Sequence, residues 1–174
     1  MDIETRAHLA RLFAQRGYKV GAEIGVAEGE YAQVLCGTIP GLKYYGIDSW
    51  PREGKLRNYI QARYELAKKR LEPYNATLIV KTSMEAVKDF ENSSLDFVYI
   101  DASHQFDPVV YDIIEWTKKV RKGGVVAGHD YRLTGDCGVV PAVDGYVRSH
   151  MYHLNLTTDE NETITWWFDK RWRS

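Results

Sequence analysis

Hydrophobic positions along the chain follow two alternating patterns. Short continuous apolar runs, typical of strands covered on both faces, separate longer segments in which apolar residues recur at helical spacing. The apolar runs predict strands at Tyr18–Val26, Lys43–Asp48, Thr77–Val80, Leu95–Ile100 and Val125–Ala127. The helical spacing predicts helices at Asp2–Gln15, Glu30–Ile39, Leu56–Leu71, Met84–Phe90 and Pro108–Arg121. Strands alternating with helices indicate a mostly parallel sheet with right-handed crossovers.

The last part of the chain changes this rhythm. A helix is predicted at Pro141–Ser149, and two strand-like runs follow at Tyr152–Thr157 and Thr163–Phe168. A tight hairpin between these two runs would add one antiparallel strand to the parallel sheet. The pattern therefore predicts a Rossmann-like, doubly wound α/β fold with an antiparallel ending.

Composition and charge limit the function classes. The chain has 174 residues with 44% hydrophobic and 27% charged residues, as expected for one globular domain over 1–174. The formal net charge of -1 gives no electrostatic reason to expect nucleic acid or an anionic membrane as partner. Two distant cysteines, Cys36 and Cys137, do not make a disulfide framework. Without a signal pattern or a long apolar run, we expect a cytoplasmic protein.

Chemistry is expected where the strands end, because ligands of open α/β sheets bind outside the carboxyl ends of the strands. The first strand runs into Gly25 and Gly29, and glycines there let the backbone approach a ligand. A dinucleotide pyrophosphate would favour Gly-x-Gly-x-x-Gly, whereas this chain has Gly25-x-x-x-Gly29. Glu23 adds a carboxylate, which suits an ammonium group better than a pyrophosphate.

The second and third strands end in further polar candidates. Asp48 ends the second strand, and its carboxylate could accept both hydroxyls of a ribose. Its alternative role is a helix cap or a solvated turn residue. Ser83 and Met84 follow the third strand and could flank an adenine, although Ser83 could equally be an N-cap.

The fourth and fifth strands end in acidic and histidine residues. Asp101 and His104 follow the fourth strand, and His129 and Asp130 follow the fifth. Two carboxylates that converge at one mouth repel unless a cation or proton lies between them. Oxygen ligands of this kind suit Mg²⁺, Mn²⁺ or Ca²⁺, and His129 could add a nitrogen. His104 is a candidate general base, with a structural cap of the helix near Pro108 as its alternative.

These motifs together resemble the bacterial class I methyltransferase family that includes macrocin-type sugar O-methyltransferases. The resemblance covers about Tyr18 to Phe168. It rests on the order and spacing of motifs that include Glu23-Ile-Gly-Val-x-x-Gly29, Gly46-Ile-Asp48-Ser-Trp50, Ile100-Asp101-x-x-His104, Lys122-Gly-Gly-Val-Val-Ala-Gly-His129-Asp130-Tyr131, Ala142-Val-Asp144 and Trp166-Trp167.

The resemblance implies a seven-stranded sheet whose last strand is antiparallel, and S-adenosylmethionine as cofactor. Glu23, Gly25 and Asp48 are then expected to contact the cofactor, and Gly29, Ser49, Ser83, Met84 and Asp101 are further candidates. Metal-dependent relatives hold a cation through carboxylates matching Asp101 and Asp130. Because an acidic residue often stands where this chain has His129, the third metal ligand is open. In those relatives the residue matching His104 can serve as base.

The reaction expected from this resemblance is methyl transfer to a hydroxyl oxygen of a small molecule, with a sugar as one acceptor. A cation, Mg²⁺ or Mn²⁺, and His104 would assist. Trp50–Tyr64 and Tyr131–Gly138 are the expected covers of the acceptor site, and the chain could form a homo-oligomer. The alternatives are an NAD-dependent oxidoreductase, a metal-dependent hydrolase and a non-catalytic relative that binds cofactor or metal.

Overall fold

The computed structural model describes residues 3–50, 57–133, 137–159 and 163–171. Its centre is one seven-stranded sheet in the order β3-β2-β1-β4-β5-β7-β6. The strands are β1 Val20–Ile24, β2 Lys43–Asp48, β3 Ala76–Val80, β4 Leu95–Ile100, β5 Val120–Gly128, β6 Asn155–Leu156 and β7 Trp166–Asp169. The first five strands pair in parallel, and β7 pairs antiparallel with both β5 and β6. The predicted doubly wound sheet with an antiparallel last strand is confirmed.

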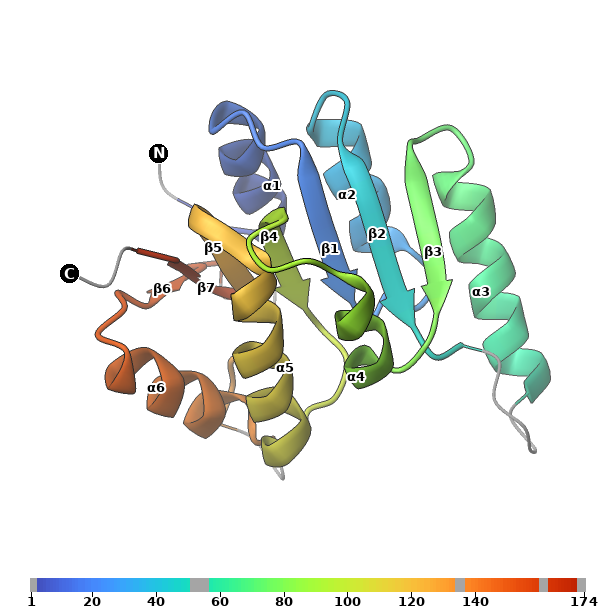
Figure 1. The fold of residues 1–174 in the computed structure, drawn as a ribbon. Coiled ribbons are helices and arrows are strands. Elements are labelled where there is room, and N and C mark those ends of the chain that lie inside the picture. Colours follow the sequence, from blue (N-terminus) through green and yellow to red (C-terminus); the bar gives the residue numbers. More distant parts are fainter. Residues whose placement is uncertain (1–2, 51–56, 134–136, 160–162, 172–174) are drawn as a thin grey trace.

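Three helices cover each face of this sheet (Figure 1). One face carries α1 Arg6–Gln15, α2 Glu30–Thr38 and α3 Arg57–Leu71. The other face carries α4 Ser83–Ala86 with the short 3₁₀ helix η1 Val87–Asp89, α5 Phe106–Lys119 and α6 Val139–Ser149. None of the described helices is long and apolar enough to cross a membrane. Asp2 and Leu56, where two helices were predicted to begin, lie outside the described residues.

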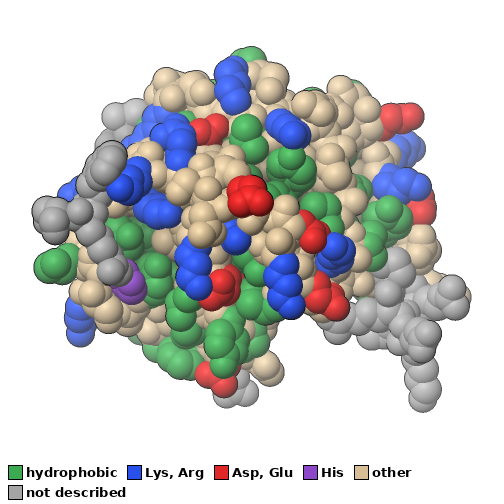
Figure 2. Space-filling model, viewed as in Figure 1, with side chains coloured by type: hydrophobic (Ala, Val, Ile, Leu, Met, Phe, Trp, Pro, Cys, Tyr) green, Lys and Arg blue, Asp and Glu red, His purple; other side chains and the backbone are tan. Residues whose placement is uncertain are grey.

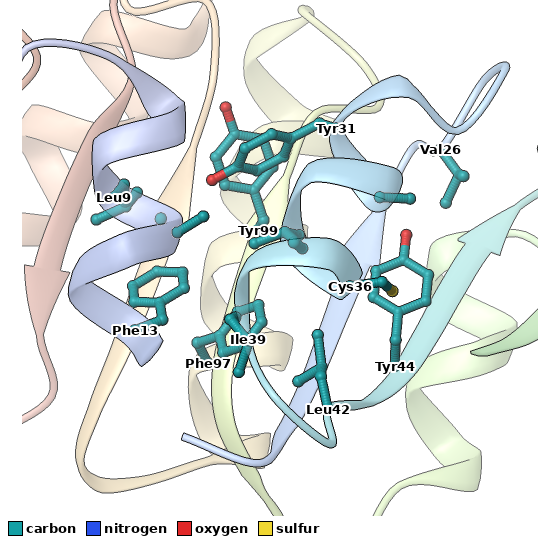
Figure 3. Packing of buried hydrophobic residues seen from close by; sticks show 14 of the residues in the cluster. Leu9, Phe13, Val26, Tyr31, Cys36, Ile39, Leu42, Tyr44, Phe97 and Tyr99 are labelled. Atoms are coloured by element: carbon teal, nitrogen blue, oxygen red, sulfur yellow. The ribbon is translucent and has the colours of Figure 1, made fainter. Parts of the chain in front are cut away.

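Strand alternation sends successive side chains into two separate cores. Phe97 and Tyr99 of β4 point into the core shared with α1 and α2, where Phe13 and Phe97 stack with their ring centroids 4.4 Å apart. Figure 3 shows these side chains meeting in one layer with Tyr31 and Tyr44. Val98 and Ile100 point the other way, toward α5 and α6. Both faces are therefore buried, which explains the continuous apolar runs in the sequence.

The boundary between α5 and β5 differs from the prediction. The predicted helix continued to Arg121, and the two glycines after it were expected to precede a strand starting at Val125. Instead α5 ends at Lys119, and β5 starts at Val120. Val120 pairs with Leu95 and Val125 with Phe97, so the intervening residues bulge out of register. Gly123 has φ of +75° in this bulge, a conformation that glycine adopts without strain.

The strand order reverses direction between β1 and β4. The chain moves outward to β2 and β3 on one side and to β4 and β5 on the other. Such a switch point opens a crevice at the carboxyl ends of the two central strands. In Figure 1 these ends are the downward arrowheads of β1 and β4. The residues that follow them, Gly25 and Asp101, therefore lie at the crevice.

Candidate functional site

A cavity of about 670 Å³ opens at the carboxyl ends of β1, β2, β3 and β4. It is lined by residues from four loops and from the start of α5. They include Gly25, Asp48, Ser49, Thr82, Ser83, Met84, Asp101, Ser103, Tyr111 and Asp112. Six of the residues predicted to contact a cofactor line this one cavity: Gly25, Asp48, Ser49, Ser83, Met84 and Asp101.

Gly25 is needed where the loops after β1 and β4 pass each other. Its φ is +89°, and a Cβ atom there would lie 2.1 Å from the Asp101 carbonyl oxygen. Gly29 plays a different part, because it is not among the residues that line the cavity. It caps α2 with φ of +79° and packs against Ala67 of α3. Gly29 therefore shapes the loop, and a direct contact with a cofactor stays a prediction.

Asp48 ties the end of β2 to the loop after β1. Its Oδ2 accepts hydrogen bonds from the backbone N–H groups of Val26 (3.1 Å) and Ala27 (3.0 Å). Its Oδ1 accepts from the N–H of Trp50 at 3.1 Å. A carboxylate offers about four acceptor positions, so about one is left for a ligand hydroxyl. Asp48 was expected to accept both ribose hydroxyls, and the loop N–H groups use most of that capacity.

Ser83 lies in a short hydrogen-bond chain on the opposite wall. Thr82, not Ser83, is the N-cap of α4, and it forms a capping box with Glu85. The Ser83 hydroxyl accepts from Trp116 Nε1 at 2.8 Å and donates to Asp112 Oδ1. The alternative role of Ser83 as an N-cap is therefore wrong, since its side chain is held against α5.

Glu23 of β1 is a buried acid beside the crevice. Only 2% of its surface is exposed, and its Oε2 accepts a hydrogen bond from the Tyr44 hydroxyl at 2.6 Å. Burial raises the pKa of Glu23 to about 8, and the charge of Asp101 adds to this, against the Tyr44 hydrogen bond. Without a cationic ligand Glu23 is therefore mostly protonated at neutral pH.

A second cavity of about 320 Å³ adjoins the first. Its lining is rich in acidic residues, Glu23, Glu28, Glu30, Asp101 and Asp130 among them, and includes Arg6 and Arg63. The two cavities share Gly25, Ala27, Arg63, Asp101 and Ala102.

Two arginines contribute positive charge to the second cavity. Arg63 pairs with Glu28 at 2.8 Å. The guanidinium of Arg6 lies over the Tyr31 ring, 5.2 Å from its centroid. Arg6 was not recognised in the sequence, because only the packing of α1 brings it to the crevice.

Asp101, His104 and Asp130 form the chemical centre of the second cavity. One potential ligand atom from each lies within 4.8 Å of the others. His104 Nε2 is 2.8 Å from Asp130 Oδ2. Burial raises the pKa of Asp101 to about 6, and the charge of Asp130 adds to the shift. The pKa of Asp130 is lowered, chiefly by His129 and further by His104 and Arg132.

His129 lies at the edge of this group. Its Nδ1 is 3.7 Å from Asp101 Oδ2 and 3.5 Å from Asp130 Oδ2. The compact group is thus completed by His104, whereas the sequence suggested His129 as the third ligand. His104 does not cap α5, because the N-cap is Gln105 and the His104 ring faces Asp130.

The backbone supports the close approach of these loops. Asp130 has φ of +55°, a left-handed conformation that costs energy outside glycine and is best tolerated by Asn and Asp. The N–H of Gly138 donates to the carbonyl oxygen of His104 at 2.7 Å, which joins the loop after β4 to the start of α6. Residues 51–56 and 134–136, in the two segments expected to cover an acceptor, lie outside the described residues.

The rim of the site exposes apolar side chains. Phe106 and Tyr111 of α5 are 48% and 58% exposed, and Leu133 after β5 is 84% exposed. Figure 2 shows hydrophobic side chains gathered toward the lower edge of this face, the edge at which the strand arrowheads end in Figure 1. A ligand at this edge would meet charged groups inside and apolar groups at the rim.

The fold and the crevice at its switch point define a Rossmann-like α/β protein. A family model described as a methyltransferase domain matches residues 22–131, which is more than half of the chain. The chain belongs to this methyltransferase family. The matched segment contains the loops after β1, β2, β3 and β4 and the first three residues after β5, Asp130 among them.

One curated relative is the protein y4gI of Sinorhizobium fredii. It is 25% identical over 118 residues, which are 67% of this chain and 13% of that protein. The chain thus spans about an eighth of the length of the curated relative that it matches.

Solved structures share the fold at low sequence identity. Cofactor-bound Rv0187 from Mycobacterium tuberculosis (MTB) superposes with a TM-score of 0.71 at 14% identity, over 95% of this chain and 79% of that one. An O-methyltransferase from Bacillus cereus in complex with SAH has a TM-score of 0.68 at 15% identity, over 95% of this chain and 80% of that one. These likenesses confirm the predicted fold class. The predicted relation to macrocin-type sugar methyltransferases stays a prediction.

Proposed function

We propose that the protein transfers the methyl group of S-adenosylmethionine to a hydroxyl oxygen of a small molecule. The observation that carries this proposal is the pair of adjoining cavities at the switch point. The larger has the lining expected for a nucleoside, and the smaller gathers charged groups suited to an amino acid and to a reacting hydroxyl. The Bacillus cereus structure with SAH supports the same choice of cofactor.

In this proposal the nucleoside occupies the larger cavity. Asp48 accepts a ribose hydroxyl with its remaining acceptor position, and Ser49 lies beside it. The adenine ring extends toward Met84 and the start of α5. Gly25 belongs to the wall that the two cavities share, and it adds no side chain of its own there.

The amino acid end of the cofactor then enters the smaller cavity. Its ammonium group lies near Glu23, and its carboxylate lies near the guanidinium of Arg6. A positive ligand stabilises the ionised form of Glu23, so binding near neutral pH releases a proton from a carboxyl whose pKa is about 8. This proton release distinguishes the proposed orientation from one with the ligand reversed.

The residues at the end of β4 and β5 fit a divalent cation. Two carboxylates, Asp101 and Asp130, converge, and the mutual repulsion of the two acids favours a positive ion between them, with His104 beside it as base and not as a ligand. Oxygen-rich sets of this kind suit Mg²⁺ or Mn²⁺. Such an ion would lower the pKa of the acceptor hydroxyl and fix its position.

His104 acts as the general base in this mechanism. The acceptor hydroxyl lies beside Asp101 and Asp130, and its proton passes to Nδ1 of His104, because Nε2 carries the proton that it donates to Asp130. The bond between the methyl carbon and the sulfonium sulfur breaks as the bond to the acceptor oxygen forms, which leaves a neutral thioether. Asp130 stabilises the protonated imidazole, since the two groups are 2.8 Å apart. The protein's own part is to align the reactants and to take up one proton.

Binding and transfer assays test this function directly. Calorimetry with SAH, S-adenosylmethionine and NAD identifies the cofactor, and we expect heat with the first two. A methyl-transfer assay with hydroxylated acceptors, sugars among them, is then run with Mg²⁺, with Mn²⁺ and with excess EDTA. Tight binding of NAD, with no heat of binding from S-adenosylmethionine, would contradict the proposed cofactor and function. Transfer that is unchanged in EDTA would remove the cation from it.

A further inference from the structure

Asp112 of α5 is a buried acid that the mechanism above does not use. Its side chain lines the larger cavity, yet only 4% of the residue surface is exposed. Among the described residues it has no salt bridge, although buried acids are usually paired with a positive group. Its hydrogen bond from Ser83 leaves acceptor positions on the carboxylate.

The hydrogen bonds from Trp116 to Ser83 and from Ser83 to Asp112 determine that Asp112 acts as an acceptor. Trp116 Nε1 can only donate, and it donates to the Ser83 hydroxyl at 2.8 Å. The single hydroxyl proton of Ser83 is then directed to Asp112 Oδ1. Asp112 is therefore held as an acceptor, and Ser83 has no proton left for a ligand. Burial raises the pKa of Asp112 to about 6, so the ionised form still prevails above neutral pH.

The residues around Asp112 indicate which kind of ligand could bind beside it. Met84, Pro108 and Tyr111 contribute to the same cavity wall, and Asp48 lies at the end of β2, where the proposed ribose binds. A flat ring placed between these walls would meet Asp112 at its edge. A partly desolvated carboxylate at that place needs a donor. The Watson–Crick and Hoogsteen edges of adenine carry one donor, the 6-amino group.

We infer that Asp112 accepts a hydrogen bond from the 6-amino group of adenine and thereby selects adenine over other purines. The inference rests on the proposed function, since it takes the ligand to be an adenosyl compound. It assigns Ser83 and Trp116 a supporting role, because they orient the carboxylate and do not touch the ring themselves. A purine with a carbonyl oxygen at position 6 would place that acceptor opposite the Asp112 carboxylate, which is also an acceptor, so no hydrogen bond would form.

The test compares two ligands that differ in one group. They are SAH and its 6-deamino analogue, in which purine replaces adenine, and their dissociation constants are measured by calorimetry at about pH 7.5. Hydrogen bonds to a charged group contribute enough to predict an approximately 10- to 100-fold preference of the wild-type protein for SAH. Asp112→Asn keeps the shape and still accepts from Ser83, but it turns an amide N–H₂ toward the ligand. With this variant the two ligands should bind equally well.

Asp107→Asn is the matched control. It removes the same charge from an exposed position on the same helix, and it should keep the wild-type preference. If Asp112→Asn fails to fold, Ser83→Ala replaces it, and the preference should shrink because the carboxylate loses its orienting bond.

Three results would overturn the inference. The first is equal binding of both ligands by the wild-type protein, and the second is an unchanged preference in the variant tested. The third is a wild-type protein that binds neither ligand. Only that third result also overturns the proposed function, whereas binding of SAH without preference leaves it standing.

Discussion

Acidic residues at the two ends of the parallel strands differ in how well they are hydrogen-bonded. At the amino end, Asp96 accepts hydrogen bonds from the N–H groups of Lys19 (2.6 Å) and Val20 (2.8 Å) and from Arg121 Nε at 2.6 Å. Although burial opposes it, these bonds lower the pKa of Asp96. Arg16 pairs with Asp169, where the antiparallel β7 ends. Acids at this end are satisfied by donors of the protein itself.

At the carboxyl end, where Asp48 and Asp130 also have donors of the protein, three other acids are buried with few donors. Glu23, Asp101 and Asp112 all have raised pKa values, and burial is the largest cause in each case. Asp96 is therefore stabilised in its ionised form at one end of the sheet, whereas burial disfavours the ionised form of these three acids at the other. Acids with strongly perturbed pKa values in a crevice are candidates for a functional site. The contrast supports the proposed site at the carboxyl end of the strands.

The largest expected effect is on turnover. His104→Ala removes the proposed base, and we expect methyl transfer to slow by ~100- to 10,000-fold with nearly unchanged affinity for SAH. The matched control is His153→Ala, at an exposed position before β6, which should leave the rate unchanged. Steady-state rates and calorimetry measure the two quantities. Normal turnover in His104→Ala would contradict a role of His104 as the general base.

The next effect is on cofactor affinity. Asp48→Ala removes the acceptor for a ribose hydroxyl and leaves the N–H groups of Val26 and Ala27 without that partner. We expect SAH binding to weaken by ~1–3 kcal/mol, and calorimetry measures the change. Asp107→Ala, on the exposed start of α5, should bind as the wild-type protein does. Wild-type affinity in Asp48→Ala would mean that Asp48 only holds the loop.

A third effect concerns stability and pH. The folded-state pKa of Glu23, about 8, lies above its ordinary value of 4.5, so between these values the unfolded chain has lost a proton that the folded one keeps. The free energy of unfolding should therefore fall as the pH rises through this window, by ~1.4 kcal/mol per pH unit from this group.

Glu23→Gln should remove that part of the slope, because glutamine does not titrate in this range. Urea unfolding at pH values between about 5 and 8 measures the difference between variant and wild type. Glu91→Gln, at an exposed position, is the control and should keep the wild-type slope. A Glu23→Gln protein with the wild-type slope would show that Glu23 is ionised when folded.

The smallest effect belongs to the amino end of the sheet. Arg121→Ala breaks the ion pair with Asp96, in which the arginine side chain is 42% exposed. We expect a loss of ~0.2–1 kcal/mol in the free energy of unfolding and no change in SAH affinity. Thermal or urea unfolding and calorimetry check both parts. A change in cofactor affinity would mean that the two ends of the sheet are coupled.

The sequence predicted the fold well because each element has a strong local signal. The runs Lys43–Asp48 and Leu95–Ile100 match β2 and β4 residue for residue. The bulge at Gly123 was missed, since two glycines after a helix are also typical of a helix end. The last hairpin was predicted, but β6 is shorter than its apolar run, because only Asn155 and Leu156 pair with β7.

The site was only partly predictable for a different reason. Asp48 ends β2, and Asp101 and Asp130 come within two residues of the ends of β4 and β5, so the topology alone brings them to one crevice. Arg6 and Asp112 reach the cavities from helices, and their part depends on how α1 and α5 pack. The choice between His104 and His129 depends on the geometry of the two loops, in which His104 comes to 2.8 Å from Asp130 and His129 to 3.5 Å. Side chains placed by packing leave no spacing signal in one sequence.

The most direct test of this account is calorimetry of SAH binding at about pH 7 in two buffers of different ionisation enthalpy. We predict micromolar-range binding with release of a proton from Glu23, so the observed heat should change with the buffer. The Glu23→Gln variant should bind with a heat that is less dependent on the buffer. Absence of binding, or binding with the same heat in both buffers, would contradict the claim that the buried acids at the carboxyl end are held for the cofactor.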